Sequence, residues 1–166
     1  MTALQIIFLI AAAATLGSGV MVVTARNLVH AALWLIVSLF AVAVLFVLLE
    51  AGFLAAVQVV LYIGAIAILI IFAIMLTRRV MQDAAPQTNR QWWLGALMAV
   101  ALFAALFVVL RQVTYPVANA DVPLNNLQTL GESFVDPNQY LLPFEVASVL
   151  LLAAMIGAIA IAGDKK

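Results

Sequence analysis

Cysteine is absent from this chain of 166 residues, histidine occurs once, and charged residues make up only 8% of the sequence. The missing cysteines exclude disulfides, thiol catalysis and iron–sulfur clusters held by thiolates. The shortage of charge is just as informative, because an average soluble domain has about 25% charged residues. The composition therefore excludes an ordinary soluble domain.

Catalytic and nucleic-acid-binding patterns are also missing from the sequence. It has no glycine-rich phosphate loop followed by lysine, no His-Glu-x-x-His pair for zinc and no Gly-x-Ser-x-Gly nucleophile turn. The formal net charge is zero and the basic residues flank apolar runs, which disfavours nucleic-acid binding. We expect no catalytic residue, metal ligand or cofactor ligand in this chain.

Apolar residues dominate what is present, since 68% of the chain is hydrophobic. Five apolar runs each have about the 20 residues that a helix needs to cross the hydrocarbon core. The backbone must satisfy its own hydrogen bonds in lipid, and β-barrel strands would be half as long, so the runs predict helices. We predict an all-α, polytopic membrane protein with a single membrane domain over residues 1–166. Its five transmembrane helices are expected at about residues 2–24, 28–49, 53–76, 92–110 and 144–162.

The basic residues predict how these helices are oriented. Six of the seven lysines and arginines follow the first, third and fifth apolar runs, and those three segments share one side of the membrane. Positive charge is retained in the cytoplasm, so we expect the N-terminus outside and the C-terminus in the cytoplasm. The connection 111–142, which contains three prolines, then becomes an external loop with room for a short surface helix.

Titratable side chains are missing from the middle of the predicted spans. His30 lies near the inner end of the second span, Glu50 at its outer end, and Glu145 near the start of the fifth span. We expect His30 to sit among lipid headgroups, Glu50 to reach external water, and Glu145 to interact with the helix dipole in a first turn opened by Pro143. A proton path needs titratable or polar groups at depth, so this chain alone is not expected to conduct protons.

The third apolar run, residues 53–76, differs from a plain lipid anchor because its first half carries Gln58, Tyr62 and Gly64. Gln58 and Tyr62 are four residues apart and share one face of a helix, whereas Gly64 lies about 200° round from Tyr62. Packing among other helices explains these residues, because an amide bonds to a neighbour and glycine allows close contact. A glycine also weakens the regular hydrogen-bond ladder, which suggests a span able to deform.

Three blocks of the sequence resemble the J-type membrane subunit of proton-pumping NADH:quinone oxidoreductase, respiratory complex I. They are the third run with Tyr-Ile-Gly-Ala-Ile at 62–66, Asn-Leu-Val-His-Ala-Ala-Leu at 27–33, and Leu-Leu-Pro-Phe-Glu-Val-Ala-Ser at 141–148. The number of spans and the predicted orientation also fit this family. Some members carry glutamate where this chain has Gln58, and a relay role that needs a carboxylate does not transfer to an amide.

The resemblance implies a non-catalytic subunit of the membrane arm that helps couple quinone reduction to proton translocation. It implies FMN, iron–sulfur clusters and quinone in the parent complex, with none of them bound by this chain. The implied partners are the antiporter-like and quinone-site membrane subunits and the lipid bilayer. The implied location is the inner (plasma) membrane of a bacterial cell.

In this family the third helix can contain a π-bulge around the tyrosine–glycine segment, and its conversion to regular α-helix is associated with opening and closing a water path. One extra residue in a turn rotates everything beyond it by about 100°, so a bulge near residues 62–65 would change which residues face a neighbouring helix. The resemblance therefore implies a gate in the third span. The gating candidates are Tyr62, Gly64, Gln58, Ile66, Leu69 and Phe72, with Glu145, Glu50 and His30 as secondary candidates.

Three other interpretations stay open from the sequence. A related photosynthetic or hydrogenase-type complex would use the same membrane subunit with a different electron donor. A component of a small ion transporter or antiporter would be expected to carry titratable residues at depth. A purely structural anchor would tolerate apolar substitutions at the polar and glycine positions of the third span.

Overall fold

The computed structural model describes residues 2–77, 91–113 and 125–163. These residues form helices and short connections without a β-strand, which confirms the all-α prediction for them. Five of the described helical stretches are long and apolar enough to cross a membrane, so the chain is a multi-pass membrane protein. They are α1 (Ala3–Thr24), α2 (Leu28–Leu48), a third span over Gly52–Leu76, α5 (Trp92–Gln112) and α7 (Leu141–Ala162).

The orientation of these spans stays a prediction. Of the six basic residues on which it rests, only Arg26 belongs to the part of the chain that the structure describes. The other five, which lie outside the described residues, are Arg78, Arg79, Arg90, Lys165 and Lys166.

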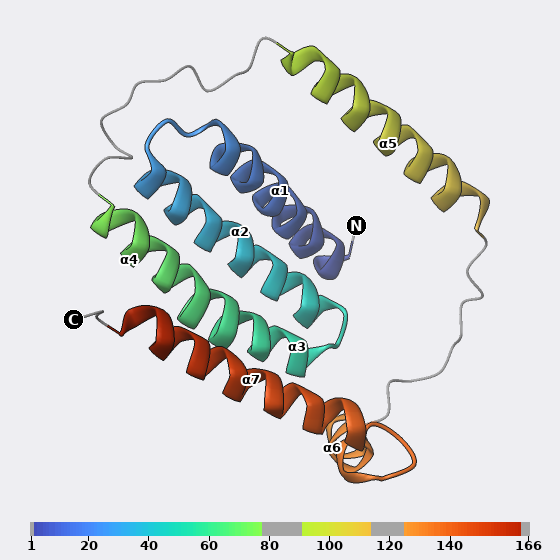
Figure 1. Ribbon diagram of the computed structural model, residues 1–166. Helices are drawn as coiled ribbons and strands as arrows, with labels where there is room; N and C mark the ends of the chain where they lie inside the picture. The colour runs from blue at the N-terminus through green and yellow to red at the C-terminus, as the bar shows by residue number, and fades with distance from the viewer. Residues whose placement is uncertain (1, 78–90, 114–124, 164–166) are drawn as a thin grey trace. The chain divides into compact units, whose positions relative to one another are not determined.

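The chain divides into two compact units, Met1–Ala118 and Asn119–Lys166. In the first unit, α2 lies between α1 and the third span (Figure 1). The buried residues of α1 and α2 are small, which lets neighbouring membrane helices approach closely. The buried members are Ala11 and Ser18 in α1 and Ala32, Ala41 and Ala43 in α2.

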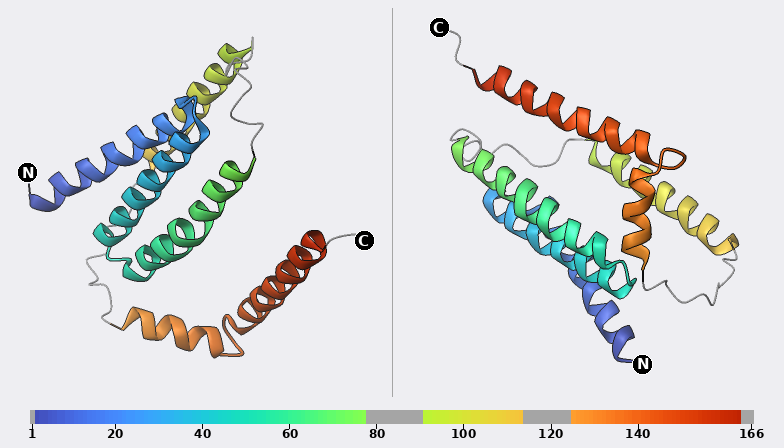
Figure 2. Two further views of the ribbon diagram at one scale, coloured as in Figure 1. Left: turned by 90° about the vertical axis from the view of Figure 1, so that its left-hand side faces the viewer. Right: turned by 90° about the horizontal axis from the view of Figure 1, so that it is seen from below.

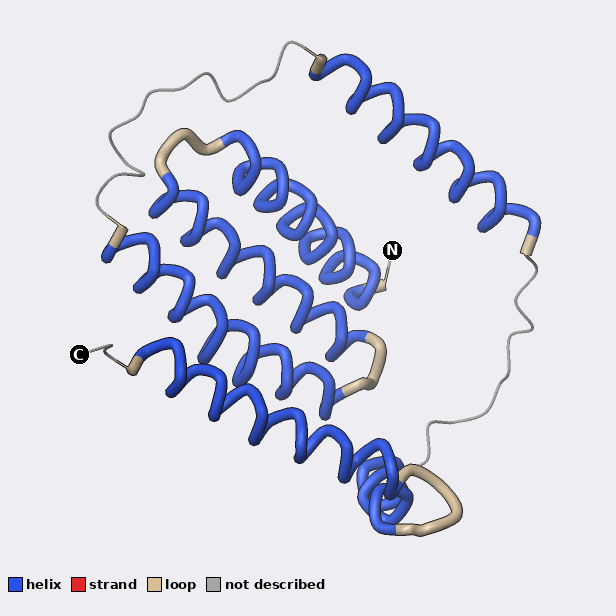
Figure 3. Tube along the Cα trace, viewed as in Figure 1, coloured by secondary structure: helices blue, strands red, loops and turns tan. Residues whose placement is uncertain are grey.

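The third span consists of α3 (Gly52–Val57), the π-helix η1 (Gln58–Ala67) and α4 (Ile68–Leu76). Figure 3 shows it as one uninterrupted helix with loops only at its two ends. Its bounds differ by one residue from the predicted 53–76. A π-helix is widened because its hydrogen bonds join residues five apart, and ten residues is long for a geometry that mostly occurs as single-turn bulges.

The connection from α2 to α3 is three residues long and tightly hydrogen-bonded. The Ala51 N–H donates to the Phe46 carbonyl at 2.9 Å and the Glu50 N–H to the Val47 carbonyl at 3.0 Å, the pattern of a Schellman motif. Glu50 takes the left-handed position of this motif with φ of 59°, where glycine is usual. The second span therefore ends at Leu48 in a defined turn, with the Glu50 side chain exposed as expected.

The fourth span, α5, continues to Gln112 and so ends two residues after the predicted 110. The guanidinium of Arg111 lies 5.1 Å from the centre of the Phe107 ring, one turn earlier on the same helix. A cation in the last turn also favours the negative end of the helix dipole, so arginine extends this helix. Every residue of α5 is exposed in the chain by itself.

The second unit contains α6 (Asn126–Val135) and α7, which lie at a steep angle to each other (Figure 2). The Phe134 and Phe144 rings stack with centroids 5.7 Å apart and join the two helices. The helix α6 lies within the predicted external loop 111–142, where a short surface helix was expected.

The last span begins at Leu141, three residues before the predicted 144. Pro143 fits inside its first turn because the first N–H groups of a helix have no intrahelical acceptor, and the first such bond here runs from Phe144 to Tyr140. Glu145 is therefore the fifth residue of α7, and the prediction that it lies in the first turn is wrong. The helix dipole stabilises anions mainly within the first turn, so its effect on Glu145 is smaller than expected.

Candidate functional site

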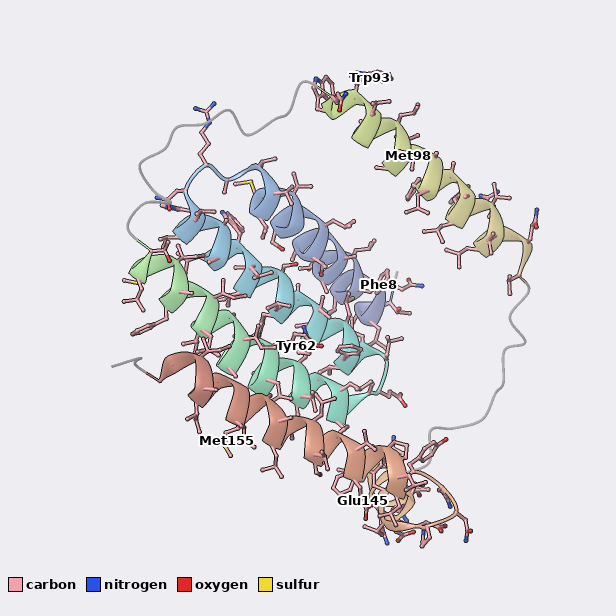
Figure 4. All side chains as sticks on the ribbon, viewed as in Figure 1. Phe8, Tyr62, Trp93, Met98, Glu145 and Met155 are labelled. Carbon is pink, nitrogen blue, oxygen red and sulfur yellow. The ribbon has the colours of Figure 1, made fainter. Side chains whose placement is uncertain are left out.

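The candidate site is the segment η1 in the middle of the third span. It contains four of the predicted gating residues, Gln58, Tyr62, Gly64 and Ile66. Tyr62, labelled in Figure 4, lies midway along this span. The predicted deformation near residues 62–65 therefore coincides with a π-helical segment, which extends further in both directions than those four residues.

Gly64 is the residue whose surroundings show the π geometry most directly. A Cβ atom built on Gly64 would lie 3.4 Å from the carbonyl oxygen of Val59, five residues earlier. In a regular α-helix the carbonyls nearest a Cβ atom belong to residues three and four earlier, and at Gly17 and Gly95 nothing beyond the neighbouring backbone of the same helix lies within 4 Å of such an atom. The approach of a carbonyl from five residues earlier is thus a consequence of the π turn. Alanine would just fit, whereas a β-branched side chain would place further methyl groups beside this carbonyl.

Gln58, the first residue of η1, is turned toward α2. Its side chain is only 7% exposed, and its Nε2 donates to the carbonyl oxygen of Leu39 in α2 at 3.5 Å. The bond is long, but a carbonyl in a helix has a second lone pair that accepts it. Gln58 therefore joins the third span to α2, which agrees with the expectation that its amide bonds to a neighbouring helix.

The residues of the third span that face α2 do not follow the spacing of a regular α-helix. Gln58 and Ala67 are both buried, and nine residues separate them. A regular α-helix makes two turns in about seven residues, so η1 uses about two more residues for the same two turns. Below η1 the less exposed residues are Ile71 and Ile74, which continue the side marked by Ala67.

Of the bulky gating candidates, Leu69 and Phe72 lie on the side away from Ala67. Tyr62 is 46% exposed, and Ile66, Leu69 and Phe72 are exposed as well. On a regular α-helix that kept Gln58 in place, Tyr62, Leu69 and Phe72 would lie within about 40° of Gln58 and Ile66 about 80° from it. The structure therefore shows Leu69 and Phe72 turned away from α2, and regular α geometry would bring these two residues toward it.

The secondary candidates lie at the ends of elements and not at η1. His30 is exposed in the first turn of α2, beside the cap where the Asn27 side chain accepts from the Val29 N–H at 2.9 Å. Glu50 is in the connection before α3, and Glu145 belongs to the second unit. Their proposed parts in gating stay predictions.

Sequence reasoning missed two participants of the site. One is the Leu39 carbonyl, which no sequence pattern identifies because every residue carries such a group. The other is Ala67, the most buried residue of the third span at 1% exposure. Its nine-residue spacing from Gln58 fits neither a helical nor a strand period, so the signal was visible only once the π geometry was known.

The chemistry available at this site is packing and hydrogen bonding. In the described part of the chain no three His, Asp or Glu side chains gather where they would hold a metal ion. Several hydroxyl groups bond to carbonyls of their own helix, as when Thr15 donates to the Ala11 carbonyl at 2.8 Å and Thr77, just after α4, to the Ala73 carbonyl at 2.8 Å. The arrangement places a π-helical segment against a neighbouring helix.

These features define a class of protein: a multi-pass helical membrane protein whose third span has a π-helical middle bonded to the second span. The family described as NADH-ubiquinone/plastoquinone oxidoreductase chain 6 matches residues 18–161. The chain belongs to this family, which confirms the resemblance seen in the sequence.

The chain is also similar to curated proteins, and each alignment covers most of both chains. The chain is 38% identical to NAD(P)H-quinone oxidoreductase chain 6 of Leptolyngbya boryana, covering 93% of this chain and 77% of that one. It is 38% identical to F(420)H(2) dehydrogenase subunit J of Methanosarcina mazei, covering 92% and 87%. It is 36% identical to NADH-quinone oxidoreductase subunit J of Rhodobacter capsulatus, covering 96% and 81%.

Proposed function

We propose that this chain is a non-catalytic subunit in the membrane arm of a proton-translocating NADH:quinone oxidoreductase, respiratory complex I. Its family membership and its five apolar spans support this role. The names of its relatives give three electron donors, NAD(P)H, F(420)H(2) and NADH. A subunit shared by complexes with different donors fits the membrane part of the complex better than the part that accepts electrons.

The proposed task of the subunit is to couple quinone reduction to proton translocation through a gate at η1. The single observation that carries this proposal is the ten-residue π-helix at Tyr62 and Gly64. Conversion of all of η1 to α-helix would turn α4 by about 200° relative to Gln58, because two turns would need about two residues fewer. Leu69 and Phe72 would move toward α2, and bulky apolar residues that move in this way can fill or vacate a hydrated gap.

Other subunits supply the electron and proton carriers in this proposal. The chain has no cysteine, so iron–sulfur clusters held by thiolates do not fit its residues, and FMN and quinone sites belong to partner subunits. The proposed partners are the antiporter-like and quinone-site membrane subunits, in a bacterial inner membrane, with the N-terminus outside and the C-terminus in the cytoplasm. The large apolar side chains exposed along α5 and α7 offer surface for these partners and for lipid.

The test is Gly64→Val in the assembled complex, with Gly95→Val in α5 as the matched control. Valine at 64 places methyl groups beside the Val59 carbonyl of the π turn, whereas residue 95 lies in a regular α-helix and has no atom beyond the neighbouring backbone of that helix within 4 Å of a Cβ atom. We expect fewer protons pumped per electron, or slower quinone reduction, for Gly64→Val and wild-type values for the control. If both quantities stay at wild-type levels in an assembled Gly64→Val complex, the gate is wrong.

A further inference from the structure

Gln58 occupies the junction between α3 and η1. It is the first residue of η1, directly after α3, and it is one of two buried polar residues in the described chain. Its Nε2 donates across to the Leu39 carbonyl of α2. In lipid no water competes for this donor, so the amide stays bonded to α2 unless the helices separate.

The part of the third span before Gln58 is held at its other end as well. The Schellman motif at Glu50 and Ala51 fixes the direction in which the chain leaves α2, and the Ala55 N–H donates to the Ala51 carbonyl at 3.0 Å. A covalent connection at one end does not by itself stop a short helix from turning about its axis. A second attachment away from the axis does stop it, and Gln58 provides that attachment to α3.

The part after η1 is held less firmly within the described chain. All nine residues of α4 are at least partly exposed, and its surface toward α2 consists of isoleucine side chains without a hydrogen bond between the helices among the described residues. Apolar side chains slide past each other more easily than a buried amide leaves its acceptor. The two ends of η1 therefore differ in how they are attached to α2.

We propose that Gln58 is a positioning residue that fixes α3 against α2, so that a change of geometry in η1 turns α4 alone. This inference rests on the proposed gate, since it states which end of the gate moves. Without the amide, the rotation would be shared between α3 and α4, and less of it would reach the inner end of the span. The gate residues would then move through only part of their path.

The test uses two pairs of spin labels on non-canonical residues in the assembled complex. The inner pair replaces Arg26 and Met75, and the outer pair replaces Leu4 and Leu54, all of which are exposed. Each pair is measured in the isolated complex and in complex frozen during turnover with NADH and a quinone. A rotation of about 200° moves a side chain by up to roughly 10 Å, because a helix with side chains is 10–12 Å across. In wild type we expect the inner distance to change between the two conditions and the outer distance to stay the same.

The decisive variant is Gln58→Met, which keeps an unbranched side chain and removes the donor. The control is Gln5→Met in α1, whose amide oxygen only accepts from the Thr2 N–H of its own helix at 3.0 Å. We expect Gln58→Met to make the outer distance change during turnover, to reduce the change of the inner distance, and to lower the number of protons pumped per electron. The control should behave as wild type.

The outcomes separate this inference from the proposed function. If the inner distance changes in wild type but Gln58→Met leaves both distances and the pumping ratio unaltered, Gln58 does not fix α3, and the gate stands without it. If the inner distance is the same in both conditions in wild type, the gate itself is wrong, and this inference is overturned with it.

Discussion

At the scale of single residues, Gly64 is where a larger side chain would meet the π turn most directly. A Cβ atom at 64 would lie 3.4 Å from the Val59 carbonyl, so alanine just fits and the further methyl groups of valine overpack the turn. Overpacking costs about 1–3 kcal/mol, so we expect Gly64→Val to raise the ratio of α to π geometry in η1 by at least about fivefold. The measurement is the fraction of each geometry among electron cryo-microscopy particles of the complex. Gly64→Ala is the control, because its Cβ atom just fits, and an unchanged ratio for Gly64→Val would show that the size of residue 64 does not set this balance.

The left-handed backbone conformation of Glu50 lowers the stability of the chain, and a substitution can remove this strain. A left-handed conformation costs a non-glycine residue about 1–2 kcal/mol, and Glu50 adopts it at φ of 59°. We expect Glu50→Gly to unfold at a higher detergent or denaturant concentration than wild type, and Glu50→Val at a lower one, because a β-branched residue tolerates this conformation poorly. SDS titration of the purified chain, followed by circular dichroism, measures the order. A glycine variant less stable than wild type would mean that the carboxylate contributes more than the strain costs.

At the scale of helices, the sequence predicted the number of spans, and helix ends lay within three residues of their predicted positions. Hydrophobic length alone carried that information, since lipid leaves a spanning backbone few alternatives. The ends shifted where local contacts decided them, as with Arg111 over Phe107 in α5 and Pro143 inside the first turn of α7. These contacts depend on helix register, which hydrophobic length does not define.

The site was predictable only in part, because its position depends on helix register as well as on hydrophobic length. Tyr62 and Gly64 marked where the third span departs from a plain α-helix, and η1 lies there. Which side faces α2 could not be predicted, because a helical wheel assumes a constant turn and η1 changes that turn within the span. Ala67 and the Leu39 carbonyl therefore became visible only in the structure.

The gate makes a prediction about side chains that touch little in the structure. Phe72 in α4 and Phe103 in α5 are 62% and 71% exposed, so their truncation to alanine should have similar effects on the stability of the chain. Of these two residues, only Phe72 would turn toward α2 when η1 becomes α-helical. We expect Phe72→Ala to lower the protons pumped per electron and Phe103→Ala to leave this ratio unchanged, as measured in proteoliposomes with matched quinone reduction rates. Equal ratios for the two variants in assembled complexes would contradict a gate built on α4.

At the scale of the whole molecule, the chain offers mostly apolar surface and little internal core. No residue of α5 or α7 is buried, which suits helices that are covered by lipid or by other membrane proteins. We expect a tagged chain, solubilised gently, to co-purify with large multi-span antiporter-like subunits and with the quinone-site subunits. Mass spectrometry of the eluted proteins identifies them. Recovery as a free homo-oligomer would contradict the proposed complex.

The most direct measurement of the gate is the structure of the assembled complex by electron cryo-microscopy, at rest and during turnover. We predict two classes of particles. In one, η1 is π-helical and Ala67 and Ile71 face α2, as they do here. In the other, η1 is α-helical and Leu69 and Phe72 face α2, while Gln58 stays bonded to the Leu39 carbonyl in both. A single class in which the same residues of the third span face α2 under both conditions would contradict the gate.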